Sequence, residues 1–221
     1  MPELILYHMP GACSRVTVIA LEEGNIDYKD RGVALLSGAQ RELPYLAINP
    51  KGKVPVLVVG GVVITESPVI LSYLAKQYPS AALLPATGGD LADSAGLSDL
   101  IWCAGVLHPV AHRIFRPDSY STAPSAGVKA VAIEQMGVFA NWISNRMGPN
   151  HWWYGAQWSI VDTYMAWCFS VAAGFGFPIS SYPAIEAHKH RIEARPSYKK
   201  MQQRERAAIE RDGLPVPPFY S

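Results

Sequence analysis

Residues 4–23 read LILYHMPGACSRVTVIALEE, and this stretch decides the fold of the first half of the chain. The short apolar run at 4–8 is typical of a buried strand, and the Pro-Gly pair that follows it is typical of a turn. Over residues 14–23 the apolar side chains are spaced for one buried face of a helix, which is expected to end where Gly24 follows. The stretch therefore predicts a strand, a tight turn and a helix in direct succession.

The segments that follow complete a small α/β pattern. A second strand is predicted over residues 27–33 and a helical turn over 41–48. Two β-branched runs on either side of Gly60-Gly61 are typical of a β-hairpin. Residues 67–77 begin with a serine suited to the N-cap and a proline suited to the first helical position, so they predict a third helix. The resulting order, β-α-β-α-β-β-α, predicts a compact α/β domain.

The rest of the chain predicts helices and no strand. Residues 78–90 contain two prolines and two glycines, which is typical of a linker. The predicted helices cover residues 91–114, 126–146, 159–173, 183–194 and 196–211. We therefore expect an α/β domain over residues 1–82, a linker over 83–92 and an all-helical domain over 93–221.

Composition and charge exclude several classes of protein. Of the 221 residues, 19 are Lys or Arg and 18 are Asp or Glu, so the formal net charge is +1. The chain therefore lacks the basic balance that nucleic-acid binding requires. Hydrophobic residues make up 49% and charged residues 17%, which predicts a sizeable core rather than disorder. All six Trp and all six Phe lie beyond residue 100, so we expect the two domains to have different kinds of core.

The same sequence predicts a cytoplasmic protein with no membrane partner. An acidic residue, Glu3, and no basic leader precede the first apolar run, so we expect no secretory signal peptide. The uncharged stretch at 163–179 is short for a membrane span and contains two glycines, so it predicts a buried helix. Cys13, Cys103 and Cys168 form neither a CxxC motif nor an even set, which favours a reducing compartment.

The turn at residues 10–14, Pro-Gly-Ala-Cys-Ser, places a thiol and a hydroxyl at the expected start of a helix. Free backbone N–H groups and the positive end of the helix dipole lower the pKa of a thiol there, and they also bind a thiolate. Three interpretations stay open from the residues alone. The turn activates Cys13 itself, it holds a thiolate ligand next to Cys13 and Ser14, or it is a small-residue turn with an inert cysteine.

Two further features suit an extended ligand with charged groups. Pro55 opens a strand, and the sequence alone favours an ordinary strand-opening proline. If its peptide bond is cis, however, Val54 can present its backbone N–H and C=O to a peptide-like ligand. Ser67 is an ordinary N-cap, but a helix N-terminus also binds a carboxylate, and the neighbouring Glu66 can bind an ammonium group. One ligand with both an amine and a carboxylate would use both residues.

Three of these motifs occur in the same order in the glutathione S-transferase family, and the chain resembles the bacterial beta-class enzymes of that family. They are PGACS at 10–14, NPKGKVPVL at 49–57 and TES at 65–67. The resemblance continues in LH at 107–108, FRPD at 115–118 and WSIVD at 158–162, the last of which has the shape of a helix capping box. It therefore covers most of the chain.

The resemblance implies a thioredoxin-like N-terminal domain, an all-helical C-terminal domain and glutathione as co-substrate. It implies that Cys13 lies at the sulfur of glutathione, with Ser14 as a second donor and His108 near the thiol. It also implies the residues that bind the rest of the tripeptide, which are Lys53 for the glycyl carboxylate, Val54 beside a cis-Pro55 for the cysteinyl backbone, and Glu66 with Ser67 for the γ-glutamyl amine and carboxylate.

The chain departs from the patterns of the family at three places. Pro109 follows His108 where that class has a lysine, so a cation near the sulfur is missing. The family's lysine in the loop after the second strand has no counterpart in residues 34–40, and Arg41 is only a nearby candidate. Tyr7 lies on the first strand but is not placed like the catalytic tyrosine of some animal classes, so we expect it in the core or the pocket wall.

His108 and His112 have the helical spacing of a pair of zinc ligands. The HPVAH segment lacks the acid of an HExxH motif, and the sequence offers no third ligand. We therefore expect no metal.

The activity that the resemblance implies is attack by a glutathione thiolate on a small hydrophobic electrophile, by a detoxifying enzyme that forms a homodimer. One alternative is a thiol transferase or disulfide reductase that uses Cys13 as the nucleophile. Another is a glutathione-dependent lyase, isomerase or dehalogenase, because these reactions use the same parts. A third is a non-catalytic ligand-binding protein. No residue identifies the electrophile.

Overall fold

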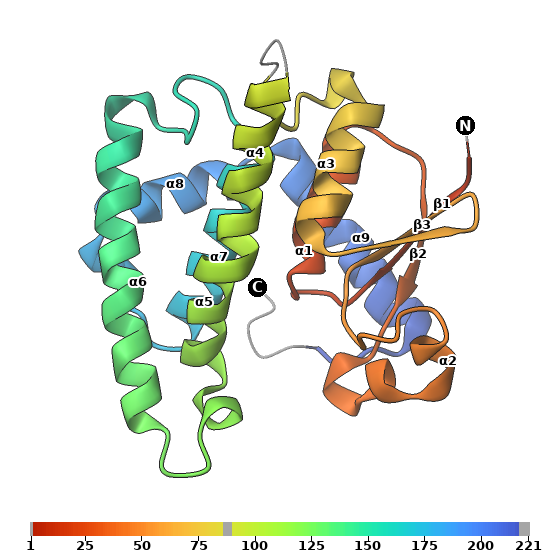
Figure 1. Cartoon of the computed structure of the whole chain (residues 1–221), viewed down its shortest axis with the longest axis horizontal. Helices are drawn as coiled ribbons and strands as arrows, with labels where there is room; N and C mark the ends of the chain where they lie inside the picture. The colour runs from red at the N-terminus through yellow and green to blue at the C-terminus, as the bar shows by residue number, and fades with distance from the viewer. Residues whose placement is uncertain (1, 86–89, 217–221) are drawn as a thin grey trace. The chain divides into compact units, whose positions relative to one another are not determined.

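The structure is a computed structural model that describes residues 2–85 and 90–216, and it divides into two compact units (Figure 1). Among the described residues, the first unit comprises 2–83 and 195–216, and the second comprises 84–194. None of the helices in the described ranges is long and apolar enough to cross a membrane.

The first unit is built on a four-stranded sheet. Its elements are β1 (Leu4–His8), α1 (Ser14–Glu23), β2 (Lys29–Gly32), α2 (Leu43–Leu46), β3 (Val56–Val59), β4 (Val62–Thr65), α3 (Ser67–Gln77) and α9 (Pro196–Asp212), with short 3-10 helices at Leu35–Ser37, Ala39–Arg41 and Pro79–Ala81. The strand order is β2-β1-β3-β4, with β1 parallel to β2, antiparallel to β3, and β3 antiparallel to β4. The predicted thioredoxin-like order of elements is therefore confirmed.

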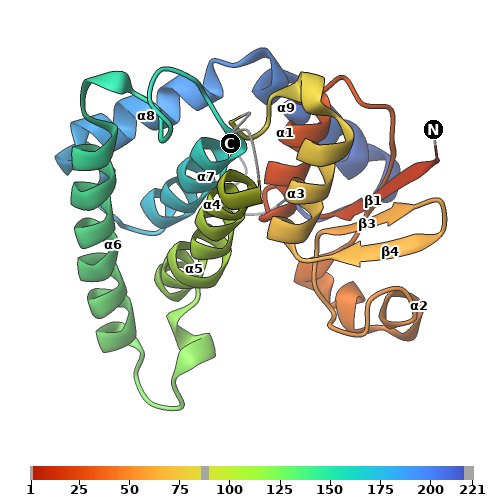
Figure 2. The same cartoon turned by 45° about the horizontal axis from the view of Figure 1, so that its top comes forward.

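The two faces of the sheet are covered by different helices. In Figures 1 and 2, α1 and α3 lie on one side of the sheet and α2 lies on the other. Leu6 of β1 pairs with Leu57 of β3, and both side chains are fully buried. The adjacent pair, Tyr7 and Val56, faces the α2 side because successive side chains of a strand alternate between faces. Tyr7 is therefore part of the core on that side, as expected.

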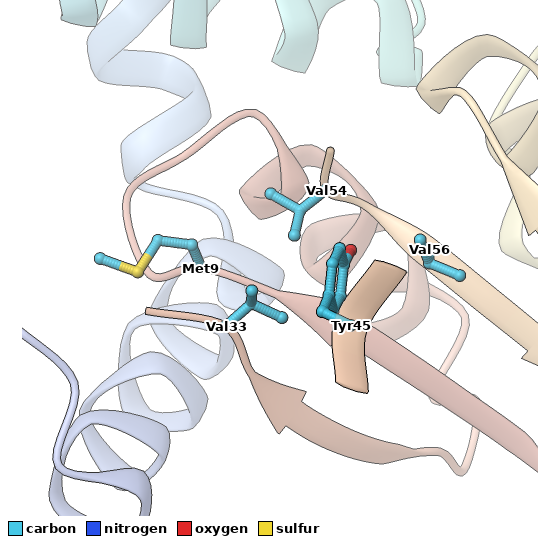
Figure 3. Packing of buried hydrophobic residues seen from close by; sticks show 5 residues of the cluster. All are labelled: Met9, Val33, Tyr45, Val54 and Val56. Atoms are coloured by element: carbon cyan, nitrogen blue, oxygen red, sulfur yellow. The ribbon is translucent and has the colours of Figure 1, made fainter. Parts of the chain in front are cut away.

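An apolar cluster on the α2 side supports the loops of the predicted site. Its buried members are Met9, Val33, Tyr45, Val54 and Val56 (Figure 3). Met9 follows β1 at the start of the PGACS turn, and Val54 lies just before β3. One cluster therefore positions both segments.

Helix α9 comes from the far end of the chain and packs against α1 and β2. Its Glu205 is fully buried and accepts hydrogen bonds from the Arg15 guanidinium (Nη2, 2.9 Å) and from the Gly11 N–H (3.1 Å). Gly11 belongs to the PGACS turn, so α9 holds that turn directly. The sequence predicts that the helical domain continues to residue 221, whereas packing groups α9 with the first unit.

Ion pairs explain why α9 belongs there. Three arginines of the C-terminal segment contact acidic groups of the first unit. The pairs are Arg195 with Glu23 at 2.6 Å, Arg204 with Glu22 at 3.1 Å and Arg211 with Asp30 at 2.9 Å. A hydrogen bond from His8 and the hydrogen-bonded guanidinium of Arg211 hold the pKa of the Asp30 carboxyl far below its usual range despite its burial.

The second unit is helical, as predicted. Its elements are α4 (Asp90–Trp102), a π-helix (Cys103–Leu107), α5 (His108–Phe115), α6 (Ala126–Met147), α7 (Ile160–Gly174) and α8 (Pro183–Glu193), with 3-10 helices at Pro117–Tyr120, Gly148–Asn150 and Ile179–Ser181. Within its described residues, the only β pairing is an isolated bridge between Trp152 and Gly155. Of the predicted linker 83–92, residues 86–89 lie outside the described residues, and residues 90–92 belong to α4.

The predicted capping box at the start of α7 is confirmed. Oδ2 of the fully buried Asp162 accepts hydrogen bonds from the N–H (2.9 Å) and the hydroxyl (2.7 Å) of Ser159. Its Oδ1 accepts a hydrogen bond from the Trp153 N–H at 2.7 Å and lies 3.0 Å from Nε2 of His188. One carboxylate thus joins α7, α8 and the loop before α7.

The buried pair of Glu205 and Arg15 leads to a stability prediction. The Glu205→Ala substitution removes the carboxylate from a buried guanidinium, so we expect the free energy of unfolding to fall by about 3–5 kcal/mol. Urea denaturation followed by circular dichroism measures this. The double variant Arg15→Met/Glu205→Leu removes both charges and fills the space, so it should recover most of the loss. Equal losses in the single and double variants would contradict this account of the pair.

Candidate active site

The PGACS turn connects β1 to α1 and places Cys13 at the N-cap of α1. Gly11 in this turn has φ of 78°, a left-handed conformation that side chains other than glycine rarely adopt. Cys13 is half-buried, and its thiol donates a weak hydrogen bond to the carbonyl oxygen of Val54, with an Sγ to O distance of 3.4 Å. The turn and the loop before β3 therefore meet at this thiol.

Burial raises the pKa of the Cys13 thiol to about 11. The backbone N–H groups of Ser14 and Cys13 and the positive charge of Lys53 act in the opposite direction, but they do not offset the desolvation. Cys13 is therefore a neutral thiol at physiological pH. A neutral thiol can donate a hydrogen bond to a negatively charged sulfur but attacks a disulfide poorly, which favours the interpretation that the turn holds a thiolate ligand.

The Ser14 hydroxyl is hydrogen-bonded within the turn. Its side chain is fully buried, and its hydroxyl donates to the Met9 carbonyl oxygen at 3.1 Å. The Ser14 Oγ in turn accepts a hydrogen bond from the Met9 N–H, also at 3.1 Å. The hydroxyl proton is therefore used inside the turn. These two bonds close the turn, and the role of Ser14 as a second donor to a thiolate stays a prediction.

The Val54-Pro55 peptide bond is cis. The isopropyl group of Val54 is buried in the α2-side cluster (Figure 3), and its carbonyl oxygen accepts the Cys13 thiol. In the described part of the chain, the Val54 N–H makes no hydrogen bond. The carbonyl oxygen of the preceding Lys53 is held by the Tyr45 hydroxyl at 2.6 Å and by Nδ2 of Asn49 at 2.8 Å. These two bonds fix the backbone of the segment.

Glu66 and Ser67 stand at the N-terminus of α3. Glu66 has φ of 68° and ψ of 120°, which is a strained backbone conformation for a residue with a side chain. Such residues cost about 1–3 kcal/mol each and occur mainly at functional sites. The Glu66 side chain is exposed and does not cap the helix, while Ser67 is buried. The carboxylate is therefore available for another partner.

The sequence reasoning missed Lys51. Its Nζ donates to Oε1 of Glu66 at 2.8 Å and to the hydroxyl of Thr65 at 3.0 Å. The sequence signal was present, because two lysines flank a glycine in KGK directly before the Val-Pro pair. The sequence predicts only Lys53 as a binding residue, because it does not show that this loop lies next to the end of β4.

The structure therefore brings most of the predicted binding residues together in the first unit. Cys13 touches Val54, and the charges of Lys53 and Glu66 act on its thiol. His108 belongs to the second unit, at the start of α5.

His108 lies among aromatic side chains of its own unit. Its Nδ1 is 3.3 Å from the Tyr164 hydroxyl, and its ring lies edge-on to Trp167 with a centroid distance of 4.6 Å. Nδ1 of His112, the other histidine of the HPVAH segment, is 2.9 Å from the Tyr120 hydroxyl. Within the described ranges, no three His, Cys, Asp or Glu side chains lie together as a metal site would require.

Comparison with known proteins agrees with this geometry. The family model described as glutathione S-transferase, N-terminal domain, matches residues 2–76. Glutathione S-transferase 3 of Zea mays is 30% identical, over the whole of this chain and the whole of its own length.

Two solved structures are similar over almost their full length. The bacterial beta-class glutathione S-transferase of Sphingomonas chungbukensis is 30% identical with a TM-score of 0.77, over 91% of this chain and 98% of its own. A sphingomonad glutathione S-transferase in complex with glutathione is also 30% identical with a TM-score of 0.78, over 96% of this chain and 100% of its own. With the thioredoxin-like unit, the helical unit and the PGACS, Val-Pro and Glu-Ser segments in place, this chain belongs to the glutathione S-transferase family.

Proposed function

We propose that the protein is a glutathione transferase in which the neutral Cys13 thiol donates a hydrogen bond to the thiolate of glutathione. The observation that carries this proposal is the position of the Cys13 thiol, at the N-terminus of α1 and in contact with the Val54 backbone. Burial raises the pKa of this thiol, which supports its role as a donor. Family membership supplies the class of reaction, which is transfer of an alkyl or aryl group to glutathione.

The remaining groups of the first unit complement a tripeptide with charges at both ends. The N–H of Val54 suits the cysteinyl backbone, and so does its C=O once the Cys13 thiol exchanges its weak bond to that oxygen for the glutathione sulfur. The Lys53 ammonium group suits the glycyl carboxylate. Glu66 suits the γ-glutamyl ammonium group, and the N-terminus of α3 at Ser67 suits the neighbouring carboxylate. Val54 belongs to the α2-side cluster and Lys53 directly precedes it, whereas Glu66 and Ser67 follow the edge strand β4.

In the reaction, glutathione loses its thiol proton to solvent and its sulfur attacks the electrophilic carbon. A carbon–sulfur bond forms, and the bond from carbon to the leaving group breaks with the electron pair departing on that group. The Cys13 proton stays on Cys13 throughout, because its role is to stabilise the negative charge on the neighbouring sulfur. On the basis of the family resemblance, we keep His108 as a catalytic residue. We propose that the aromatic side chains of the helical unit form the binding site for the electrophile.

The thiol-transferase alternative requires a Cys13 thiolate, which the raised pKa disfavours. Cleavage of ethers, dehalogenation and isomerisation use the same glutathione site and differ only in the second substrate. A purely ligand-binding role would leave the placement of a donor thiol next to Val54 without a purpose.

We propose a homodimer that uses one face of the second unit. Helices α4 and α6 and the π-helix expose a group of large apolar side chains, namely Leu97, Ile101, Val106, Val131, Val138 and Trp142. A groove of about 390 Å³ lies among Val106, Pro109, Val138 and Phe139. An exposed apolar surface of this kind is typical of a protein–protein interface, and the family resemblance makes a second copy the proposed partner.

The three free cysteines agree with the proposed location in the cytoplasm.

The raised pKa of Cys13 predicts slow alkylation. At pH 8, iodoacetamide should modify Cys13 roughly 100-fold more slowly in the folded protein than in the urea-unfolded chain, because about two pKa units separate the two thiols. Mass spectrometry of the peptide that contains Cys13 follows the reaction. The rate should rise with pH up to at least pH 10. A plateau below pH 8 would show a thiolate and would contradict the donor role.

Substitutions at Cys13 separate donor from nucleophile. Cys13→Ser retains a donor, so conjugation of glutathione to 1-chloro-2,4-dinitrobenzene should stay within a few-fold of the wild type. Cys13→Ala removes a hydrogen bond to a charged sulfur and should lower kcat by about 10–100-fold. Reduction of a small disulfide is the second assay. If wild-type protein reduces the disulfide and both variants lose only that reaction, Cys13 is the nucleophile. If wild-type protein performs neither reaction, the transferase proposal fails.

The proposed interface predicts that charge on it produces monomers. Wild-type protein should sediment at twice the mass of one chain at micromolar concentration. Ile101→Glu or Val138→Glu should yield monomers, because each buries a carboxylate in an apolar interface. Val216→Glu, at another exposed valine, is the matched control and should remain dimeric. A monomeric wild type would refute the dimer.

A further inference from the structure

The ion pair between Lys51 and Glu66 has no role in the function described so far. The Lys51 ammonium group contacts Oε1 of Glu66 and the hydroxyl of Thr65, two adjacent residues at the end of β4 and the start of α3. In the described residues, Oε2 of Glu66 receives no hydrogen bond. One carboxylate oxygen is therefore occupied and the other is available.

The loop that carries Lys51 is held in place. The Lys51 N–H donates to Oδ1 of Asn49 at 3.2 Å, and Nδ2 of the same Asn49 donates to the Lys53 carbonyl oxygen. Gly52 between the two lysines has φ of 59°, and a Cβ there would lie 3.0 Å from the Gln40 carbonyl oxygen. The loop is thus fixed on both sides of Lys51, so its ammonium group starts from a defined position.

The Lys51–Glu66 pair contributes little to the stability of the fold. Both side chains are more than half exposed, at 55% for Lys51 and 59% for Glu66. An exposed pair contributes little free energy, less than the strained backbone of Glu66 costs. The pair therefore does not offset the strain. It does restrict the direction in which an otherwise mobile carboxylate points.

We propose that Lys51 is a positioning residue for substrate, which holds Oε1 of Glu66 so that Oε2 accepts the ammonium group of the γ-glutamyl residue. This inference rests on the proposed function and adds a residue to its specificity. The Lys51 ammonium group and the substrate's ammonium group would repel each other, but each would bind a different oxygen of the Glu66 carboxylate. The substrate's own carboxylate, next to its ammonium group, reduces the repulsion further. The Lys51–Glu66 pair is thus a charge pair that complements the zwitterionic head of an amino acid.

Binding and steady-state kinetics of the full chain test this proposal. Lys51→Gln should raise both the KM and the calorimetric Kd for glutathione about five-fold, which corresponds to about 1 kcal/mol, and should leave kcat within two-fold. Lys51→Arg keeps the cation and should restore wild-type KM. Lys29→Gln removes the lysine from a comparable exposed pair with Glu3 and is the matched control, with no expected change in KM.

A double-variant cycle shows whether Lys51 acts through Glu66. In the Glu66→Gln background, Lys51→Gln should change KM by less than two-fold, because the carboxylate that it orients is gone. A lower KM in Lys51→Gln would show that the lysine competes with substrate, and would overturn the proposal. Equal losses in both backgrounds, or a lowered melting temperature with a parallel loss of kcat, would also overturn it. If wild-type protein does not bind glutathione in the calorimeter, the proposed function itself has failed, which is a distinct result.

Discussion

The position of the site depends on a buried carboxylate. Glu205 carries a negative charge in the interior, and burying an ion costs several kcal/mol unless partners surround it. Arg15 supplies the opposite charge and Gly11 supplies a backbone N–H, so the acid is both neutralised and hydrogen-bonded. Gly11 stands two residues before Cys13, and removal of the carboxylate would therefore release the turn that aims the thiol. Stability of the first unit and placement of the reactive group rest on the same contact.

The site combines groups that are individually ordinary. A protonated thiol, one unbonded N–H, a lysine and a strained glutamate come from three loops on one sheet. The sheet supplies rigidity and the loops supply the chemical groups, which is a common division of labour in binding sites. Desolvation raises the pKa of Cys13 more strongly than the helix N-terminus lowers it. The structure therefore favours a protonated Cys13, whereas the sequence alone was also compatible with a thiolate.

Local patterns predicted the fold well. The bounds of β1, α1 and α3 agree residue for residue with those expected, because Pro, Gly and Ser mark their ends. The place of α9 could not be predicted, since its arginines look like a solvated charged face until Glu22, Glu23 and Asp30 are brought opposite them. The hydrogen-bond partners of Ser14 and Lys51 could not be predicted for the same reason. Each depends on which neighbour its hydrogen bonds reach, and spacing along the chain does not encode that.

The grouping of α9 with the first unit has a consequence for synthesis on the ribosome. The sheet and its first three helices are complete in sequence by Gln77, yet Arg15 meets Glu205 only after almost the whole chain has been made. During translation, Arg15 therefore has no carboxylate partner from α9 while the helical unit is being synthesised. A fragment that stops after α3 would carry every glutathione-binding residue proposed in the first unit and still lack the helix that holds the PGACS turn.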